Sequence, residues 1–306
     1  EVVTTLLLNF VVLLFISMML EGPMKDPMSM GWPQSAPVLD AATLPKLIPR
    51  TRVHAGYARY FTPPPTEKFD STSVASFLGT TNALPSDANT AVKSERSNYF
   101  DLGVSHQLTP HLTVGLDAYY RDVRHLQDEG QFGNALLFSA FNYERGRIYG
   151  LEGSANYREG NFGAYLNVGI SRAQGKGIET GQFNFGADEL AYINSHWVNL
   201  DHDQRVAASA GVSYKYAGTT YMADALFGTG LRRGFVNSDH LPAYWQMNLG
   251  AARDFSLPTL GKFKTRLTVL NIFDRSYQLR DGTGIGVGAP QFAPRRTFLL
   301  SVSKPF

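Results

Sequence analysis

The sequence of 306 residues contains no cysteine, which excludes a disulfide framework and thiolate metal sites but leaves the compartment open. Its seven histidines are scattered without the short spacings of metal ligands, so we expect no metal site. The 28 Lys and Arg residues nearly balance 26 Asp and Glu residues, giving a formal charge of +2. This balance does not indicate a nucleic-acid partner.

Catalytic signatures are also lacking, since the sequence holds no GxSxG, P-loop or HExxH motif. "DHDQ" at 201–204 could form an acid–base pair or a metal corner, although hydrogen bonding at a rim is the interpretation we favour. "DGTGIGVG" at 281–288 does not match GxGxxG and indicates a flexible loop. We therefore predict that the protein is not an enzyme and needs no cofactor.

The chain is instead rich in aromatic residues and glycine, with 15 Tyr, 20 Phe and 29 Gly. Its mean hydropathy is only −0.17. Membrane helices would raise this value, because each span needs about 20 apolar residues. Membrane strands that alternate apolar and polar residues average out near neutral, so the composition favours them.

A period of two runs through the sequence. In "HLTVGLDAYYRD" (111–122) one face would carry Leu112, Val114 and Leu116, and the other Thr113 and Asp117. Most such runs have 9–13 residues, where soluble strands average about five or six and a tilted membrane strand needs about 9–11. Ten strands are predicted, at 52–60, 98–108, 111–123, 146–158, 161–173, 204–216, 219–229, 243–255, 262–273 and 296–306.

Short turns alternate with long connections at 61–97, 124–145, 174–203, 230–242 and 274–295. Outer-membrane barrels have this arrangement, with short periplasmic turns and long external loops. We therefore predict an all-β protein, an antiparallel transmembrane β-barrel or part of one. The last strand would run inward, with Phe298, Leu300 and Val302 facing lipid and Phe306 at the periplasmic interface.

Several segments resemble the C-terminal part of the barrel of TonB-dependent outer-membrane receptors. They are "VHAGYARYFTPPP" (53–65), "VNLDHDQRVAASAGVSYKY" (198–216), "LTVLNIFDRSYQLRDGTGIGVGAPQFAPRR" (267–296) and the last strand. The "NIFDRSY" stretch, a glycine-rich loop and a final strand ending in Phe form the most specific element. The resemblance covers about residues 50–306.

This resemblance implies a portion of a 22-stranded barrel whose lumen holds a plug. It implies uptake of a scarce ligand, such as a ferric siderophore or cobalamin, driven by the TonB complex. It also implies that Phe298, Leu300, Val302 and Phe306 form the signal read by the barrel assembly machinery. The plug and the TonB-contacting motif are not in this sequence, so we expect that the chain alone does not transport. Expected partners are outer-membrane lipid, lipopolysaccharide and a small ligand, for instance a metal chelate, but no nucleic acid.

The first fifty residues do not fit the family. Residues 1–20 are apolar without alternation and are predicted to form a separate helix, and residues 21–50 hold six prolines and read as a linker. The barrel region is predicted to span 51–306. Two exposed edges of a ten-strand arc would leave backbone groups unpaired, so we expect an open or imperfectly closed sheet.

Ligand-contacting groups should be aromatic or cationic and lie in loops or the lumen, because arginine suits anionic groups and aromatic rings suit planar ones. The alternative is that the tyrosines form the interface girdle and the arginines meet lipopolysaccharide phosphates. The candidates are Tyr57, Tyr60, Trp197, Arg232, Arg233, Tyr277, Arg280, Arg295 and Arg296. Residues predicted to line the lumen are Asp117, Arg121, Asn167, Arg205, Asp224 and Asn248.

Two other functions stay open. A complete ten-stranded barrel could act as an outer-membrane hydrolase. Its only candidate groups are His202 with Asp201 and Asp203, and His240 with Asp239. A passive pore is the other alternative, but ten strands leave little lumen, since eight are already filled by side chains.

Overall fold

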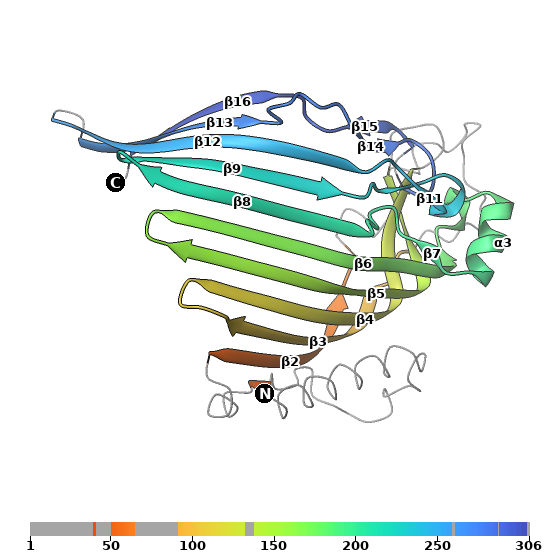
Figure 1. The fold of residues 1–306 in the computed structure, drawn as a ribbon. Coiled ribbons are helices and arrows are strands. Elements are labelled where there is room, and N and C mark those ends of the chain that lie inside the picture. Colours follow the sequence, from red (N-terminus) through yellow and green to blue (C-terminus); the bar gives the residue numbers. More distant parts are fainter. Residues whose placement is uncertain are drawn as a thin grey trace.

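Ten long strands form one antiparallel sheet in a computed structural model that describes residues 39–40, 50–64, 91–131, 138–258, 261–286 and 288–304. Neighbours along the chain are neighbours in the sheet, which curves into an open arc (Figure 1). The all-β, antiparallel prediction and the ten strands are confirmed. The strands are β2 (Thr51–Thr62), β3 (Glu95–Gln107), β4 (Leu112–Gln131), β5 (Phe138–Glu159), β6 (Phe162–Thr180), β8 (Val206–Tyr216), β9 (Thr219–Gly228), β12 (Tyr244–Leu257), β13 (Gly261–Leu270) and β16 (Thr297–Ser303).

One face of this sheet is apolar from edge to edge. Residues paired across neighbouring strands share a face, so the apolar residues can be followed from one strand to the next. Leu151 is paired with Ala118 and Ile170, and Leu267 is paired with Leu300. These side chains are exposed, with 49% of Leu151 and 74% of Leu300 accessible. An exposed apolar surface that crosses ten strands is expected only where it meets lipid or another protein.

The opposite face is polar. Asp117 lies opposite Gly103 and Glu152, and Asn248 donates from Nδ2 to Asp224 Oδ2 at 2.6 Å. The two faces thus differ as the strands of a membrane barrel require.

The arc has two edges. In the described part of the chain β16 pairs with β13 alone, and β2 pairs with β3 and with the two-residue strand β1 (Leu39–Asp40), so no ladder joins the edges. β1 falls inside the range predicted as a linker. Residues 1–20, for which a helix is predicted, lie outside the described residues, as does Phe306. Within the described residues, no helix has the length and apolar character to cross a membrane.

The predicted strand ends were wrong at the connection 124–145. β4 continues to Gln131 and β5 begins at Phe138, so only 132–137 separate them, and β6 also runs on to Thr180. Past Val123 the sequence loses its alternation because both faces of the strands meet water or protein there, yet the backbone ladder continues. A tilted membrane strand needs only about 9–11 residues, so β4, β5 and β6, with 20, 22 and 19 residues, are longer than crossing a membrane requires.

These long strands change direction at one level. His125 in β4 has φ 53°, Gly177 in β6 has φ 70°, and the β5–β6 register shifts between Asn142 and Tyr143. Asn142 is fully buried at this level, and its amide donates to the carbonyls of Lys93 and His125. Beyond it the ends of β4 and β5 turn away from the line of the sheet (Figure 1).

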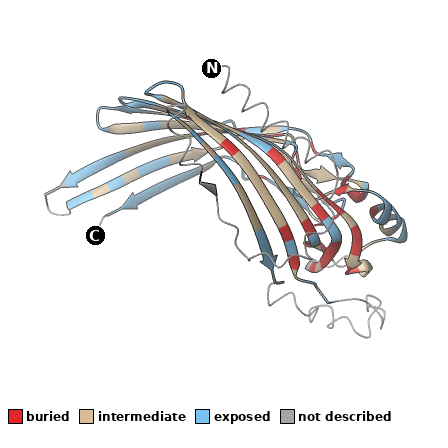
Figure 2. Cartoon of the chain, turned by 90° about the horizontal axis from the view of Figure 1, so that it is seen from below, coloured by how far each residue is buried: buried red, intermediate tan, exposed pale blue. Residues whose placement is uncertain are grey.

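The buried core lies at the end of the sheet with the long connections (Figure 2). We call the described residues of 124–145, 174–203, 230–242 and 274–295 the loop cap. It contains η3 (Gln182–Asn184), α3 (Ala187–Ser195), β7 (Val198–Asn199), β10 (Arg232–Arg233), η4 (Phe235–Asn237), β11 (Asp239–His240), β14 (Gln278–Asp281) and β15 (Pro290–Phe292). The apolar cluster consists of Val123 and, within the loop cap, Leu126, Phe141, Tyr143, Ile178, Ile193, Val198, Val236 and Ile285.

Candidate functional site

The glycine-rich loop holds the loop cap together from one side of the arc to the other. It leaves the sheet after β13, yet it contacts the end of β4, six strands away in the sheet order. Gln131 N–H donates to the Gly286 carbonyl at 3.0 Å, and Gly288 N–H donates to Gln131 Oε1 at 2.9 Å. Gly286 has φ 118°, and a Cβ there would lie 2.6 Å from Asp201 Oδ2, so only glycine fits this close approach.

Two arginine–aspartate pairs fix the connections to one another. Arg232 from β10 donates from Nε and Nη2 to Asp203 Oδ2 at 2.8 and 2.6 Å. Arg280 from β14 approaches Asp201 Oδ2 at 2.8 Å. Both aspartates are buried, with exposures of 2% for Asp203 and 7% for Asp201. The charges therefore neutralise each other inside the loop cap.

His202 bridges the second pair. Its Nδ1 contacts Asp201, and its Nε2 lies 2.8 Å from Arg280 Nη2. The hydrogen bond to Asp201 raises the pKa of His202. Because both ring nitrogens are engaged, His202 is not placed to activate a serine or a water, which speaks against the hydrolase alternative.

Asp128, near the end of β4, is a part-buried acid with one buried carboxyl oxygen. Its Oδ1 accepts from Glu129 N–H at 2.8 Å, but its buried Oδ2 has no hydrogen-bond partner among the described residues. Burial, with Asp201 as a second cause, raises the pKa of Asp128 to about 8. This carboxyl is therefore protonated at neutral pH.

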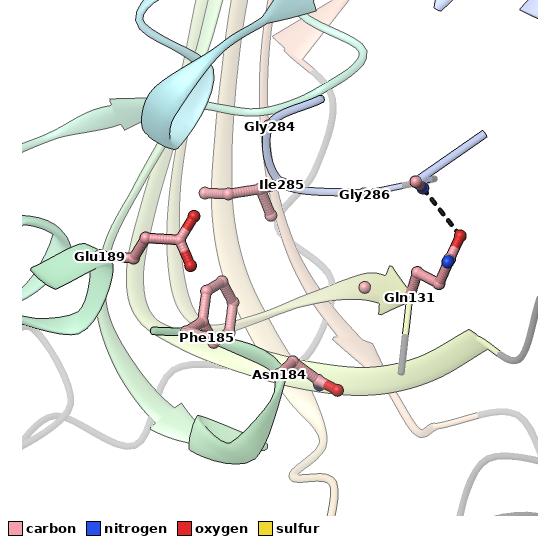
Figure 3. A pocket seen from close by; sticks show the side chains of 9 residues that line it. Gln131, Asn184, Phe185, Glu189, Gly284, Ile285 and Gly286 are labelled. Carbon is pink, nitrogen blue, oxygen red and sulfur yellow. Dashed lines mark hydrogen bonds between the residues drawn. The ribbon is translucent and has the colours of Figure 1, made fainter. Parts of the chain in front are cut away.

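A cavity of about 160 Å³ opens between β4, α3 and the glycine-rich loop. Figure 3 shows Asn184, Phe185 and Glu189 on one side and Gln131 and the loop from Gly284 to Gly286 on the other. Phe185 is held edge-on against Phe141, with ring centroids 4.9 Å apart. Gly130 and Gly288 complete the lining.

The family profile described as TonB dependent receptor-like, beta-barrel matches residues 41–272. The chain belongs to the TonB-dependent receptor family. The family is one of outer-membrane barrels that act as receptors and transporters, which confirms the resemblance on which the sequence prediction rests. None of the curated protein sequences matches the chain.

Solved structures of receptors share the fold. The ferric-catecholate import receptor Fiu from Escherichia coli K12 is 16% identical with a TM-score of 0.52, and 84% of this chain covers 33% of that one. The copper transporter OprC is 16% identical with a TM-score of 0.55, over 82% and 37% of the two chains. The ferric yersiniabactin uptake receptor FyuA from Yersinia pestis is 14% identical with a TM-score of 0.53, over 84% and 35%. The chain thus spans about a third of the length of these receptors.

In this receptor barrel every arginine predicted to contact ligand has an acidic partner. Besides Arg232 and Arg280, Arg233 lies 2.9 Å from Asp239. Arg295 and Arg296 lie 2.6 and 3.9 Å from Asp274. The hydrogen bond from Arg295 is the largest cause that lowers the pKa of Asp274.

The aromatic candidates are divided between several environments. Tyr277 stacks on Tyr244 with centroids 4.4 Å apart and donates to Gln246 at 3.0 Å. Trp197 lies under the Arg147 guanidinium, 4.3 Å from it. Two further candidates are on β2 and differ in their face.

Tyr57 is paired with Phe100 and therefore shares the apolar face of the sheet. Tyr60 is paired with Ser97 on the polar face, where its ring packs edge-on against Tyr99 at 6.1 Å. Only Tyr60 of these two tyrosines is directed away from the apolar face.

The residues predicted to line the lumen share the polar face or continue it. Arg121 donates to Ser97 at 3.0 Å, Asn167 donates to Ser209 at 3.4 Å, and Arg205 donates to the Ser171 carbonyl at 3.1 Å. The remaining members are Asp117 on β4, and Asp224 and Asn248, which are paired on the neighbouring strands β9 and β12.

Sequence reasoning missed the cavity and Asp128. The cavity residues come from three connections whose approach no local pattern encodes. The spacing of Gly282, Gly284, Gly286 and Gly288 was the one available signal, and it indicated a flexible loop rather than a packed wall.

Proposed function

We propose that this chain is the barrel region of an outer-membrane receptor for TonB-dependent uptake of a scarce ligand, such as a ferric siderophore or cobalamin. Membership of the receptor family supports this proposal. So do the structural neighbours, which include a ferric-catecholate import receptor, a copper transporter and a ferric yersiniabactin uptake receptor.

The observation that carries the proposal is the segregation of the molecule into three surfaces. An apolar face crosses ten strands, a polar face lies behind it, and the long connections fold into the loop cap at one end of the sheet. A barrel wall with one elaborated mouth suits capture of a ligand from one side of a membrane.

In this proposal the loop cap faces the outside, and the short turns and the C-terminus face the periplasm. Phe298, Leu300 and Val302 are exposed on the apolar face at the β16 edge. We assign to them, with Phe306, contact with lipid and the assembly signal. Lipopolysaccharide would surround the outer rim, and the TonB complex would supply energy to the whole receptor.

Ligand contact is assigned to the loop cap and to the part of the polar face next to it. Tyr60 and Tyr277 are aromatic groups of that region, whereas Tyr57 is assigned to lipid. Because each candidate arginine already has an acidic partner, these arginines would position the connections and would not supply free positive charge to a ligand.

Uptake in the source cells tests the proposal. Cells with and without the gene would be offered a panel of ⁵⁵Fe-labelled siderophores and labelled cobalamin, with and without a protonophore. We expect one member of the panel to lose its energy-dependent uptake in the deletion strain, and the product to fractionate with outer membrane. Unchanged uptake of every member, with the product in another fraction, would contradict the proposal.

A further inference from the structure

The "NIFDRSY" stretch (271–277) forms a turn after β13 that one side chain holds in place. Asn271 is buried, has φ 50°, and donates from Nδ2 to the carbonyls of Arg275 at 2.8 Å and Pro294 at 3.1 Å. Its Oδ1 accepts from Arg275 N–H at 3.0 Å. A single amide thus fixes the backbone of this turn beside the segment that leads into β16.

Three arginines meet one carboxylate at this turn. Asp274 accepts from Arg295 Nε at 2.8 Å and Nη2 at 2.6 Å, and from Arg296 N–H at 2.9 Å. The Arg296 guanidinium lies 3.9 Å from the same carboxylate. Arg275 forms no ion pair with any described residue. Three guanidinium groups against one carboxylate leave the turn with a net charge of +2.

The Arg275 guanidinium lies on the apolar side of the sheet. Its central carbon is 4.4 Å from the centroid of the Trp245 ring, and Phe273 packs edge-on against the same ring at 5.5 Å. Trp245 is paired with Phe227, and both side chains are exposed on the apolar face. A guanidinium above a ring can still direct its N–H donors sideways, because they lie in its own plane. No described residue accepts a hydrogen bond from this side chain.

Further from the loop cap, the same side of the sheet is purely apolar. Phe298 is paired with Val269, which is paired with Leu249, and 69% of Phe298 is exposed. Trp245 is near the start of β12, at the end of the sheet with the loop cap. A cation, aromatic rings and an apolar wall therefore follow one another along the strands. A lipid has the matching order, with its phosphate at the level of the tryptophan belt and its acyl chains beyond.

We infer that Arg275 and the turn around it bind a phosphate group of lipopolysaccharide. Arg275 would donate to the phosphate oxygens, and Arg295 and Arg296 would contribute the positive charge that Asp274 does not offset. The apolar face would take the acyl chains. This inference deepens the proposed function, on which it rests for the assignment of the loop cap to the outside. It concerns the apolar side of the sheet, opposite the polar face assigned to the transported ligand.

Lipid retention by the full chain tests this inference. The chain in nonionic detergent micelles would be mixed with bisphosphorylated lipid A, with the same lipid after removal of both phosphates, or with inorganic phosphate, and bound molecules would be counted by native mass spectrometry. We expect bisphosphorylated lipid A to be retained at least about fivefold better than the dephosphorylated lipid. Equal retention of the two lipids would overturn the inference. Inorganic phosphate that binds as well as the lipid would also overturn it, because the site would then be one for small anions.

Arginine variants locate the site. Arg275→Gln removes a side chain without a hydrogen-bond partner among the described residues, so the fold should be kept and lipid A retention should fall about fivefold. Arg275→Lys keeps the charge and should restore most of the retention.

Arg253→Gln is the matched control. Arg253 is on the same side of β12 as Trp245, lies over the Phe255 ring at 5.5 Å, and is near the turn to β13 at the other end of the sheet. Retention should be unchanged in this variant, and a loss equal to that of Arg275→Gln would replace the site by general charge attraction. Lipid retention is measured without transport, so this inference and the proposed uptake can fail separately.

Discussion

Replacement of Asp128 by Asn should stabilise the loop cap at neutral pH. The pKa of this carboxyl is raised from 3.8 to about 8 in the folded protein. Between these two values the folded loop cap binds about one proton more than the opened one. The free energy of opening the loop cap therefore falls as pH rises, by about 1.4 kcal/mol per pH unit. The contribution of the protonated Asp128 carboxyl to the stability of the folded loop cap is complete below pH 3.8 and is lost as pH rises through 8.

From the ordinary pKa up to pH 7, this slope amounts to a cost on the order of 4 kcal/mol for holding the carboxyl neutral. Asparagine avoids this cost because it is neutral at every pH. Its Oδ1 can still accept from Glu129 N–H, and its Nδ2 places a donor where Asp128 Oδ2 has no partner.

Hydrogen exchange at the amide of Gln131 provides the measurement, because this N–H is bonded to the glycine-rich loop and exchanges when the loop cap opens. The wild-type protein should lose protection between pH 5 and 8, after correction for intrinsic exchange, and Asp128→Asn should stay nearly level. The two should converge towards pH 4. Asp188→Asn should behave as wild type. Parallel pH profiles for wild type and Asp128→Asn would refute the reasoning.

Three further outcomes are expected. Leu151→Arg should destabilise the membrane-embedded sheet by about 2–4 kcal/mol, measured by urea unfolding in lipid vesicles, whereas Asn167→Arg on the polar face should cost little; similar costs would mean that the faces are wrongly assigned. Asp203→Ala leaves the buried Arg232 guanidinium without its acidic partner, which should destabilise the loop cap by about 3–5 kcal/mol. The loop cap should then become accessible to limited trypsin digestion, and an unchanged digestion pattern would contradict this. The chain has no cysteine of its own, so cysteines introduced at Gln131 and Gly288 can be tested for disulfide formation under a mild oxidant. This pair should form a disulfide, whereas a pair at Gln131 and Ser303 should not. Equal yields would argue against the contact across the arc.

The fold could be predicted from the sequence because both the apolar–polar period and the length of a membrane strand depend on its environment. "HLTVGLDAYYRD" keeps Leu112, Val114 and Leu116 on one side, and β4 begins at the first of them. The same signal fails beyond Val123, where the alternation of apolar and polar residues stops. The predicted strand end there was wrong by eight residues, since β4 continues to Gln131.

The candidate site was less predictable for a different reason. Residue type pointed to arginines, but the partners that neutralise them, such as Asp203 for Arg232 and Asp201 for Arg280, come from other connections. Nothing in a local stretch shows that Asp128 Oδ2 is buried or that the Asn184 amide has no hydrogen-bond partner among the described residues. Those properties arise only when distant loops meet, so they require the fold.

The two arginine–aspartate pairs bear on how such receptors can be engineered. Each pair takes its cation from one connection and its anion from another. Grafting a single loop from this chain onto a related barrel would transfer half of a buried ion pair and leave the other half behind. The smallest portion that could be exchanged to change ligand preference is therefore the set of connections carrying Asp201, Asp203, Arg232 and Arg280, moved together.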